Sequence, residues 1–264
     1  PDWGSGHGGH AGGRAGAQGT GPRRGSLWGR GTVPREAETL GTKIGSFDNP
    51  SQVEADDLNR QQFDEAMQVI QMALDQETFA FHGEIYDFPP PGIPDRGGTV
   101  KELTLVPRPL YPYETWQAIT SPPTLEQVPR RGWGGVFWNN HPTFLTERWS
   151  RFAEVYEEAH GRELARGEKR MLVLCTRVED TREEAVEKLR PGHDEFWKFL
   201  GPYGWSKGYM GADGRPAPAG LVPTLEESID QRIFLPGSPE DLADSIGWYR
   251  DLVGVEDLLL FPGM

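Results

Sequence analysis

The stretch MLVLCTRVEDTREEAVEKL, residues 171–189, decides the fold of this chain. Its opening part, 171–178, is a continuous apolar run, which is typical of a strand buried on both faces of a parallel sheet. Thr181 and Glu184 then form the T-x-x-E pattern of a capping box, which starts a helix. A buried strand that passes directly into a helix is a βα unit, so the sequence predicts a parallel sheet flanked by helices.

The same alternation continues on both sides of this stretch. Short apolar runs that suggest strands lie at 116–120, 134–138 and 258–261. Apolar side chains recur at helical spacing in 58–75 and 146–166, and Ser238-Pro239 starts a last helix. Residues 78–88, TFAFHGEIYDF, predict a short hairpin or an extended arm. We expect four or five strands, too few to close a βα barrel, which has eight strands and typically needs about 250 residues.

Composition excludes several classes of protein. The 264 residues are 36% hydrophobic, which is enough apolar surface for a packed core and excludes wholesale disorder. The longest apolar runs, 171–175 and 258–261, are far shorter than the roughly 20 residues that cross a bilayer, so we expect no membrane span. The net charge of −13 argues against nucleic acid as a partner. A single cysteine, Cys175, fits a reducing compartment, and we expect a cytoplasmic protein.

Residues 1–26 differ from the rest of the chain. They are rich in glycine and arginine and show no periodic apolar pattern, so we expect this segment to be disordered. No apolar run follows the arginines, which argues against a signal peptide. The organised part is expected to comprise residues 27–264.

Three short segments carry residues that suggest anion binding. In WGRG (28–31) the glycines let a ligand approach the backbone and Arg30 suits phosphate, although the same residues also continue the Gly/Arg-rich tail. Ser121 and Thr124 open a helix, where hydroxyl groups and the helix dipole attract phosphate, but the residues alone favour an ordinary helix cap. The third segment, Gly237-Ser238-Pro239, is explained mainly by a turn followed by a helix N-cap.

Taken in order, several segments resemble the luciferase-like flavin monooxygenases, relatives of the bacterial luciferase alpha chain. They are GRGTVPREAETLG (29–41), FDEAMQVI (63–70), FAFHGEIYDF (79–88), VPRPLYPYETWQAITSPPT (106–124), RRGWGGVF (130–137), and PGSPEDLADSI with GVEDLLLF (236–261). The resemblance extends over residues 27–264, which would form the C-terminal portion of such a barrel. It implies an α/β fold, a TIM (β/α)8-type barrel that is incomplete and covers roughly strands four to eight.

The resemblance also implies an activity. A member of this family would use reduced FMN, supplied by a flavin reductase, together with O2 to oxidise a small organic substrate. Two alternatives stand beside it: an F420-dependent oxidoreductase of the same fold, and a non-catalytic flavin-binding or degenerate barrel remnant. No catalytic residue and no metal site is assigned, because His82, His141 and His193 are isolated in the sequence.

Four residues take cofactor-binding roles from the resemblance. Arg30 matches the arginine at the end of the fourth barrel strand, which contacts the flavin phosphate. Ser121 and Thr124 match the serine and threonine after the fifth strand, at the start of the phosphate-binding helix. Thr120 lies where the family often has an acid or a small polar residue near the flavin ring. Arg30, Ser121 and Thr124 are therefore expected to converge on the phosphate.

The chain departs from the family pattern in two places. A Gly/Arg-rich stretch stands where the family has barrel strands one to three, so we expect a fragment or a reading frame altered upstream of Leu27. A partial barrel leaves an apolar strand edge exposed, and we therefore expect a homo-oligomer. Pro129 falls where the phosphate-binding helix of the family normally continues, which predicts a short or kinked helix.

Overall fold

The computed structural model describes residues 50–262 apart from 139 and 219. Side chains are described from residue 57 onward, apart from those of 139, 203 and 219. The chain divides into two units, Pro1–Val53 and Glu54–Met264, and the sheet with its helices belongs to the second. Residues 1–26, which are expected to be disordered, lie outside the described residues, and so does Arg30.

A parallel sheet is built around its longest strand, β7. Its five strands are β5 (Trp116–Ile119), β6 (Gly134–Trp138), β7 (Arg170–Val178), β8 (Phe234–Gly237) and β9 (Asp257–Pro262). β5 pairs with β6, and β6, β8 and β9 all pair with β7, in each case in the parallel direction. Since Cys175 and Thr176 pair with β8 and β9 at once, these two strands lie on opposite edges of β7.

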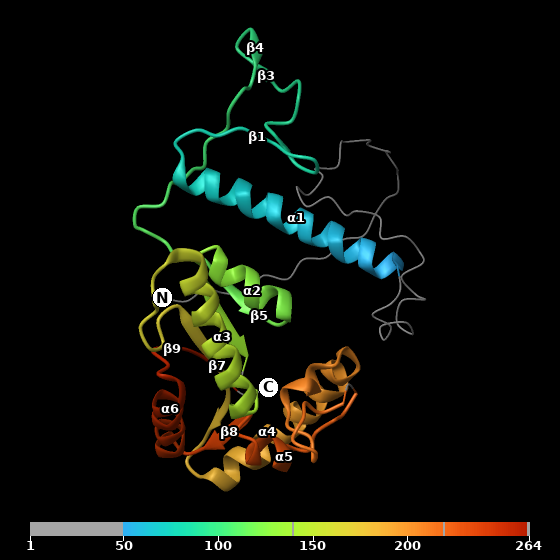
Figure 1. The fold of residues 1–264 in the computed structure, drawn as a ribbon, viewed down its shortest axis with the longest axis vertical. Coiled ribbons are helices and arrows are strands. Elements are labelled where there is room, and N and C mark those ends of the chain that lie inside the picture. Colours follow the sequence, from blue (N-terminus) through green and yellow to red (C-terminus); the bar gives the residue numbers. More distant parts are fainter. Residues whose placement is uncertain (1–49, 139, 219, 263–264) are drawn as a thin grey trace, which may run out of the picture. The chain divides into compact units, whose positions relative to one another are not determined.

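Helices connect these strands, and two short hairpins precede β5 in the chain (Figure 1). The helices are α1 (Pro50–Asp75), α2 (Pro122–Arg130), α3 (Pro142–His160), α4 (Arg182–Leu200), α5 (Leu225–Asp230) and α6 (Pro239–Val253), with 3-10 turns η2 (Gly201–Tyr203) and η3 (Trp205–Gly208) after α4. The antiparallel hairpins are β1 (Phe81–His82) with β2 (Asp87–Phe88), and β3 (Pro94–Asp95) with β4 (Gly98–Thr99). None of the described helices is both long and apolar enough to cross a membrane.

Local sequence explains where several helices begin and end. Ser121, Thr181 and Ser238 are N-caps, and each side chain accepts a hydrogen bond from the backbone N–H three residues further on. Helices α3 and α6 end at Gly161 and Gly254, whose φ angles of 62° and 72° lie in the left-handed region that favours glycine. Because these signals are short-range, the start of each capped helix follows from a few residues of sequence.

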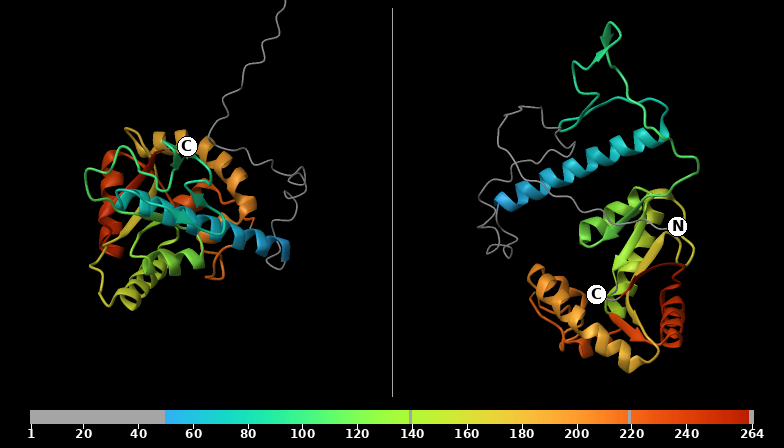
Figure 2. Two further views of the ribbon diagram at one scale, coloured as in Figure 1. Left: turned by 90° about the horizontal axis from the view of Figure 1, so that it is seen from above. Right: turned by 180° about the vertical axis from the view of Figure 1, so that it is seen from behind.

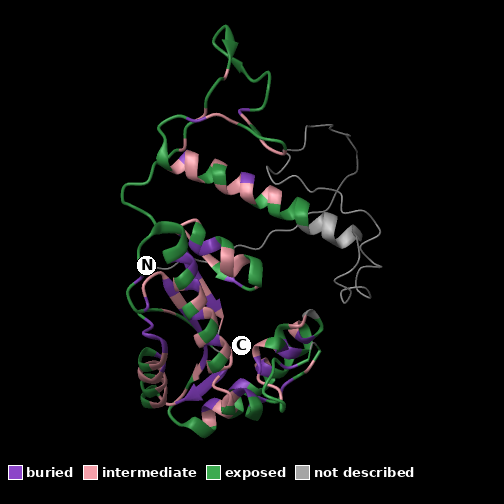
Figure 3. Ribbon diagram, in the orientation of Figure 1, coloured by how far each residue is buried: buried purple, intermediate pink, exposed green. Residues whose placement is uncertain are grey.

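Helices cover most of one face of the sheet. A row of paired residues, Ile119, Phe137 and Leu172, crosses β5, β6 and β7 and is at most 1% exposed. The side chains that pack on this row from α2, α3 and α6 are Val128, Leu145, Trp149, Phe152, Tyr249 and Val253. Figure 3 shows buried residues along the strands and on the helices beside them, and Figure 2 shows α6 against the strands from behind. This helix-covered face is the main core of the unit.

Most elements predicted from the sequence are confirmed, with shifted ends. The strand predicted at 171–178 is β7, and the segment 78–88 forms the hairpin β1–β2. The helix predicted at 146–166 runs instead over Pro142–His160, because Gly161 ends it. Pro129 is the penultimate residue of α2, which is short, at nine residues. The sequence pattern does not indicate β8, α5 or the hairpin β3–β4, which are brief segments among prolines and glycines.

A carboxylate from α1 holds the loop of the hairpin β1–β2. Glu65 is 8% exposed and accepts hydrogen bonds from the backbone N–H groups of Glu84, Ile85 and Tyr86, each at 3.0 Å. A Cβ atom at Gly83 would lie 2.3 Å from Glu65 Oε2, so glycine is what permits this close approach. The hydrogen bond from Tyr86, supported by those from Ile85 and Glu84, lowers the pKa of Glu65 below its ordinary value of 4.5.

We expect Glu65→Gln to loosen this hairpin and to remove part of the acid sensitivity of the protein. The pKa of Glu65 is lower in the folded protein than in the unfolded chain. The carboxylate therefore stabilises the fold above pH 4.5, and this contribution is lost as the pH falls through the pKa of the folded state. Hydrogen exchange at 84–86 and thermal unfolding followed through that pH range measure both effects. The expectation fails if Glu65→Gln and a control on α6, Glu240→Gln, give the same exchange and the same pH profile.

Candidate functional site

The carboxyl ends of the parallel strands bring chemically distinct side chains to one end of the sheet. Thr120 and Ser121 directly follow β5, Trp138 is the last residue of β6, and Phe261 lies near the end of β9. Ligands of parallel βα sheets bind at this end, because the loops after neighbouring strands meet there. The predicted cofactor residues in the described part of the chain therefore lie where the fold places binding sites.

Ser121 and Thr124 lie together at the start of α2. Their hydroxyl oxygens are 3.3 Å apart, and the Ser121 N–H donates to Thr124 Oγ1 at 3.1 Å. Thr124 Oγ1 in turn donates to the Ser121 carbonyl at 2.8 Å. The two residues form a capping box and are half-buried, while Thr120 is exposed. The structure thus brings together two of the three residues expected to converge; Arg30 lies outside the described residues, so its convergence stays a prediction.

The backbone at this helix start offers few donors. Pro122 and Pro123 have no N–H, and the Leu125 N–H donates to the Ser121 carbonyl. The Thr124 N–H has a long hydrogen bond of 3.5 Å to Ser121 Oγ. An anion at this position would therefore be bound by two hydroxyl groups and the Thr124 amide.

A positive charge from α3 reaches the same end of β5. Arg148 Nη2 donates to the carbonyl of Ile119, the last residue of β5, at 2.5 Å. Arg148 is half-buried, and this burial lowers the pKa of its guanidinium. Within the described residues, no carboxylate lies at ion-pair distance from it. The sequence reasoning missed Arg148, because the residue belongs to no motif and reaches β5 only through the packing of α3.

Three aromatic rings gather around Trp138 at the end of β6. The Trp138 ring centroid lies 5.7 Å from those of Trp205 and Phe261, and 6.3 Å from that of Phe196. Trp205 and Phe261 remain 38% and 37% exposed. Exposed rings beside the carboxyl ends of strands suit a planar ring system or an apolar substrate.

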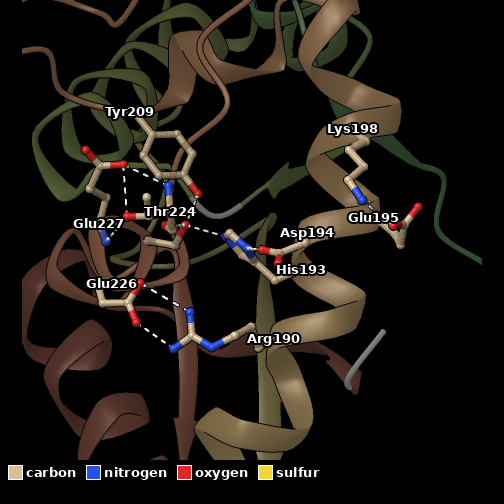
Figure 4. A network of polar contacts seen from close by, with 10 residues as sticks. Arg190, His193, Asp194, Glu195, Lys198, Tyr209, Thr224, Glu226 and Glu227 are labelled. Atoms are coloured by element: carbon tan, nitrogen blue, oxygen red, sulfur yellow. Dashed lines mark hydrogen bonds and ion pairs between the residues drawn. The ribbon is translucent and has the colours of Figure 1, made fainter.

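A buried cluster resembles a catalytic triad but is built as a structural network (Figure 4). His193 Nε2 and the Tyr209 hydroxyl each lie 2.7 Å from Ser228 Oγ, and His193 Nδ1 lies 3.2 Å from Asp194 Oδ1. Ser228 donates its own proton to the Thr224 carbonyl at 2.9 Å, so its oxygen accepts from the other two groups. Because Ser228 and His193 are fully buried and the serine proton is directed away from the histidine, this network joins α4 to α5 and activates no nucleophile.

Other candidates from the sequence also have structural roles. Burial raises the pKa of the Cys175 thiol to about 12, so it carries no reactive thiolate near neutral pH. Ser238 caps α6, and Asp241 accepts from the Ser238 N–H at 2.9 Å, which places a carboxylate where an anion would have to bind. Across the described residues, no three His, Cys, Asp or Glu side chains gather in a way that would hold a metal ion.

We expect the buried His193 to make the protein less stable in mild acid. Burial lowers the pKa of His193 below its ordinary value of 6.5, against the opposing effect of Asp194. The unfolded chain then binds more protons, so this contribution to stability is complete above pH 6.5 and is lost as the pH falls toward the folded-state value. Unfolding midpoints measured against pH should show a weaker acid dependence in His193→Gln. The control His82→Gln, at a side chain 72% exposed, should behave like the unaltered protein; identical profiles for all three proteins would rule the idea out.

The fold is an α/β barrel of the TIM type that does not close within the described residues. It consists of a parallel sheet with helices on one face, and polar groups follow β5. The family model of the luciferase-like monooxygenases matches residues 29–256, and the chain belongs to this family. The family resemblance predicted from the sequence is thereby confirmed. No curated protein sequence matches the chain.

Solved structures support the same fold. The monooxygenase RslO1 from Streptomyces bottropensis is 18% identical with a TM-score of 0.56, and the match covers 81% of this chain and 60% of that one. The oxygenating constituent of 3,6-diketocamphane monooxygenase from Pseudomonas putida, a type II Baeyer-Villiger monooxygenase in complex with FMN, is 19% identical with a TM-score of 0.56; 89% of this chain and 62% of that one are covered. The chain thus spans about three fifths of the length of these structures. The predicted incomplete TIM-type barrel is confirmed.

Proposed function

We propose that this chain binds FMN and acts as an FMN-dependent monooxygenase on a small organic substrate. Its family is one of monooxygenases, and one of the similar structures contains FMN. The arrangement of Ser121, Thr124 and Arg148 at the carboxyl end of β5 supports the proposal most directly. These residues offer two hydroxyl groups, an amide and a positive charge, which fit the phosphate of FMN.

Each residue has a defined part in this proposal. The Ser121 and Thr124 hydroxyls turn from each other toward phosphate oxygens, and the Thr124 N–H exchanges its 3.5 Å hydrogen bond for a shorter one. Arg148 offsets part of the phosphate charge. From the family resemblance, Arg30 adds a second cation and Thr120 lies nearer to the flavin ring.

The aromatic cluster around Trp138 would take the apolar side of the site. Trp205 and Phe261 present ring surface at the end of the sheet where the flavin ring would lie. Bound reduced FMN supplies the electrons for oxidation of the substrate by O2. The chain itself orients the two molecules and keeps water from the reacting atoms by means of these rings. A flavin reductase is the expected source of reduced FMN.

Titration of the chain with FMN, riboflavin and F420, followed by flavin or deazaflavin fluorescence, tests the cofactor of this proposal, and oxidation of added reduced FMN or F420, followed by absorbance, separates a catalyst from a non-catalytic flavin-binding remnant. Tighter binding of FMN than of riboflavin is expected, because riboflavin lacks the phosphate. Tighter binding of F420 than of FMN would replace the proposal with an F420-dependent oxidoreductase. Absence of binding to all three compounds would identify a barrel remnant without a cofactor.

We expect Arg148→Met to weaken FMN binding by roughly 10- to 100-fold, since a hydrogen bond to a charged group contributes about 1.5–3 kcal/mol. Thr124→Val should weaken it less, because Arg148 and Ser121 still contact the phosphate. Riboflavin affinity should be nearly unchanged in both variants. Fluorescence quenching measures the dissociation constants of FMN and of riboflavin for each variant and for the unaltered protein.

The matched control is Arg250→Met, which removes an exposed arginine from α6. FMN affinity should be unaffected by this change. Equal losses of FMN and riboflavin binding in Arg148→Met would show that the variant disturbs the fold near β5 and that Arg148 does not contact the phosphate.

A further inference from the structure

A cavity of about 270 Å³ lies beside β8, among the helices that pack on this strand. It is lined by residues of β8, of α4, α5 and α6, and of the turn after α5, elements that Figure 1 shows together. Pockets for drug-sized ligands span roughly 300–1,000 Å³, so this cavity suits a smaller molecule. In the sheet, β6 and β7 stand between β8 and β5, so the cavity is separate from the residues that follow β5.

Charged side chains from two helices and a turn line this cavity. Arg182 is the first residue of α4, Asp230 is the last residue of α5, and Arg232 lies in the turn after α5. The lining thus carries two positive charges and one negative charge, in a chain whose net charge is −13. Within the described residues, no carboxylate lies at ion-pair distance from Arg182. A small cavity with an excess of positive charge favours an anion.

The position of Arg232 is fixed by contacts on both sides. Its φ of 57° lies in the left-handed region, which is uncommon for a residue other than glycine and is retained where surrounding contacts hold it. Its N–H donates to the Ile229 carbonyl at 2.9 Å, and its carbonyl accepts from the hydroxyl of the buried Tyr249 at 2.7 Å. Its guanidinium carbon lies 4.2 Å from the centroid of the Trp248 ring. Such stacking uses the face of the guanidinium and orients its N–H donors in the plane, as binding of an oxyanion requires.

We propose that this cavity binds the phosphate group of a small phosphate monoester. A monoester carries about two negative charges near neutral pH and three acceptor oxygens, which suits two guanidinium groups better than a single carboxylate does. Two acceptors complete the lining: the Asp230 carboxylate, and Ser245 Oγ, which donates its own proton to the Asp241 carbonyl at 2.8 Å. Acceptors of this kind bind hydroxyl groups, so the ester is expected to carry hydroxyls beside its phosphate. The site does not depend on flavin binding.

Isothermal titration calorimetry of the full chain in phosphate-free buffer tests this site. Glycerol 2-phosphate, a monoester that carries hydroxyl groups, should bind more tightly than inorganic phosphate, and malate should bind more weakly than either. Arg182→Met and Arg232→Met should each weaken the binding of glycerol 2-phosphate roughly tenfold or more, because each removes a charged donor. Asp230→Asn should instead tighten the binding of inorganic phosphate, since it removes a repelling charge. A disturbed fold does not produce such a gain.

Two further variants are the controls. Arg250→Met removes an exposed arginine of α6 outside the cavity, and Arg148→Met removes the cation beside β5. Both should retain the affinity for glycerol 2-phosphate. Equal weakening by Arg250→Met and Arg182→Met, or tighter binding of malate than of inorganic phosphate, would overturn the proposal. Loss of binding in Arg148→Met alone would also overturn it and would assign the phosphate to the site after β5. FMN titrations of the same variants report on the flavin site separately, so either proposal can fail without the other.

Discussion

Pairing along both edges of β7 is the constraint on which the rest of the unit depends. β6 and β9 pair with overlapping parts of this strand, and β8 pairs with its last residues, so the carboxyl ends of these strands are fixed relative to one another. The fixed strand ends in turn determine where the following loops and helices begin. Helices then bury one face of the sheet almost completely, which leaves the strand ends as the place where polar and aromatic groups can meet a ligand.

Features that depend on a few neighbouring residues could be predicted from the sequence. Contacts between elements that are distant in the chain could not. The strand β7 and the caps Ser121, Thr181 and Ser238 depend on runs and spacings that a short window contains. The proximity of Ser121 and Thr124 follows in the same way from their separation of one helical turn. Arg148 shows the opposite case, since its contact with Ile119 exists only because α3 packs beside β5. The barrel follows from the family resemblance, whereas the position of this cation follows only from the packing of α3.

The network around Ser228 shows why distances alone do not identify catalytic groups. A serine, a histidine and an aspartate stand in hydrogen-bonding order, as they would in a hydrolase. The hydroxyl proton, however, is donated to the Thr224 carbonyl, and the serine and the histidine are closed to solvent. The serine and the histidine therefore act here as a polar link between α4 and α5, among buried apolar side chains of the same helices such as Leu189 and Leu225.

The two prolines at the start of α2 have a consequence for how this position would bind an anion under the proposed function. Because residues 122 and 123 have no N–H groups, the hydroxyls of Ser121 and Thr124 hydrogen-bond to each other and to the backbone. Any ligand must first break this reciprocal cap, whose loss typically costs about 1 kcal/mol. A phosphate ester bound there as proposed would present several oxygens at once to the two hydroxyls and the Thr124 amide, and those hydrogen bonds would offset the loss of the cap.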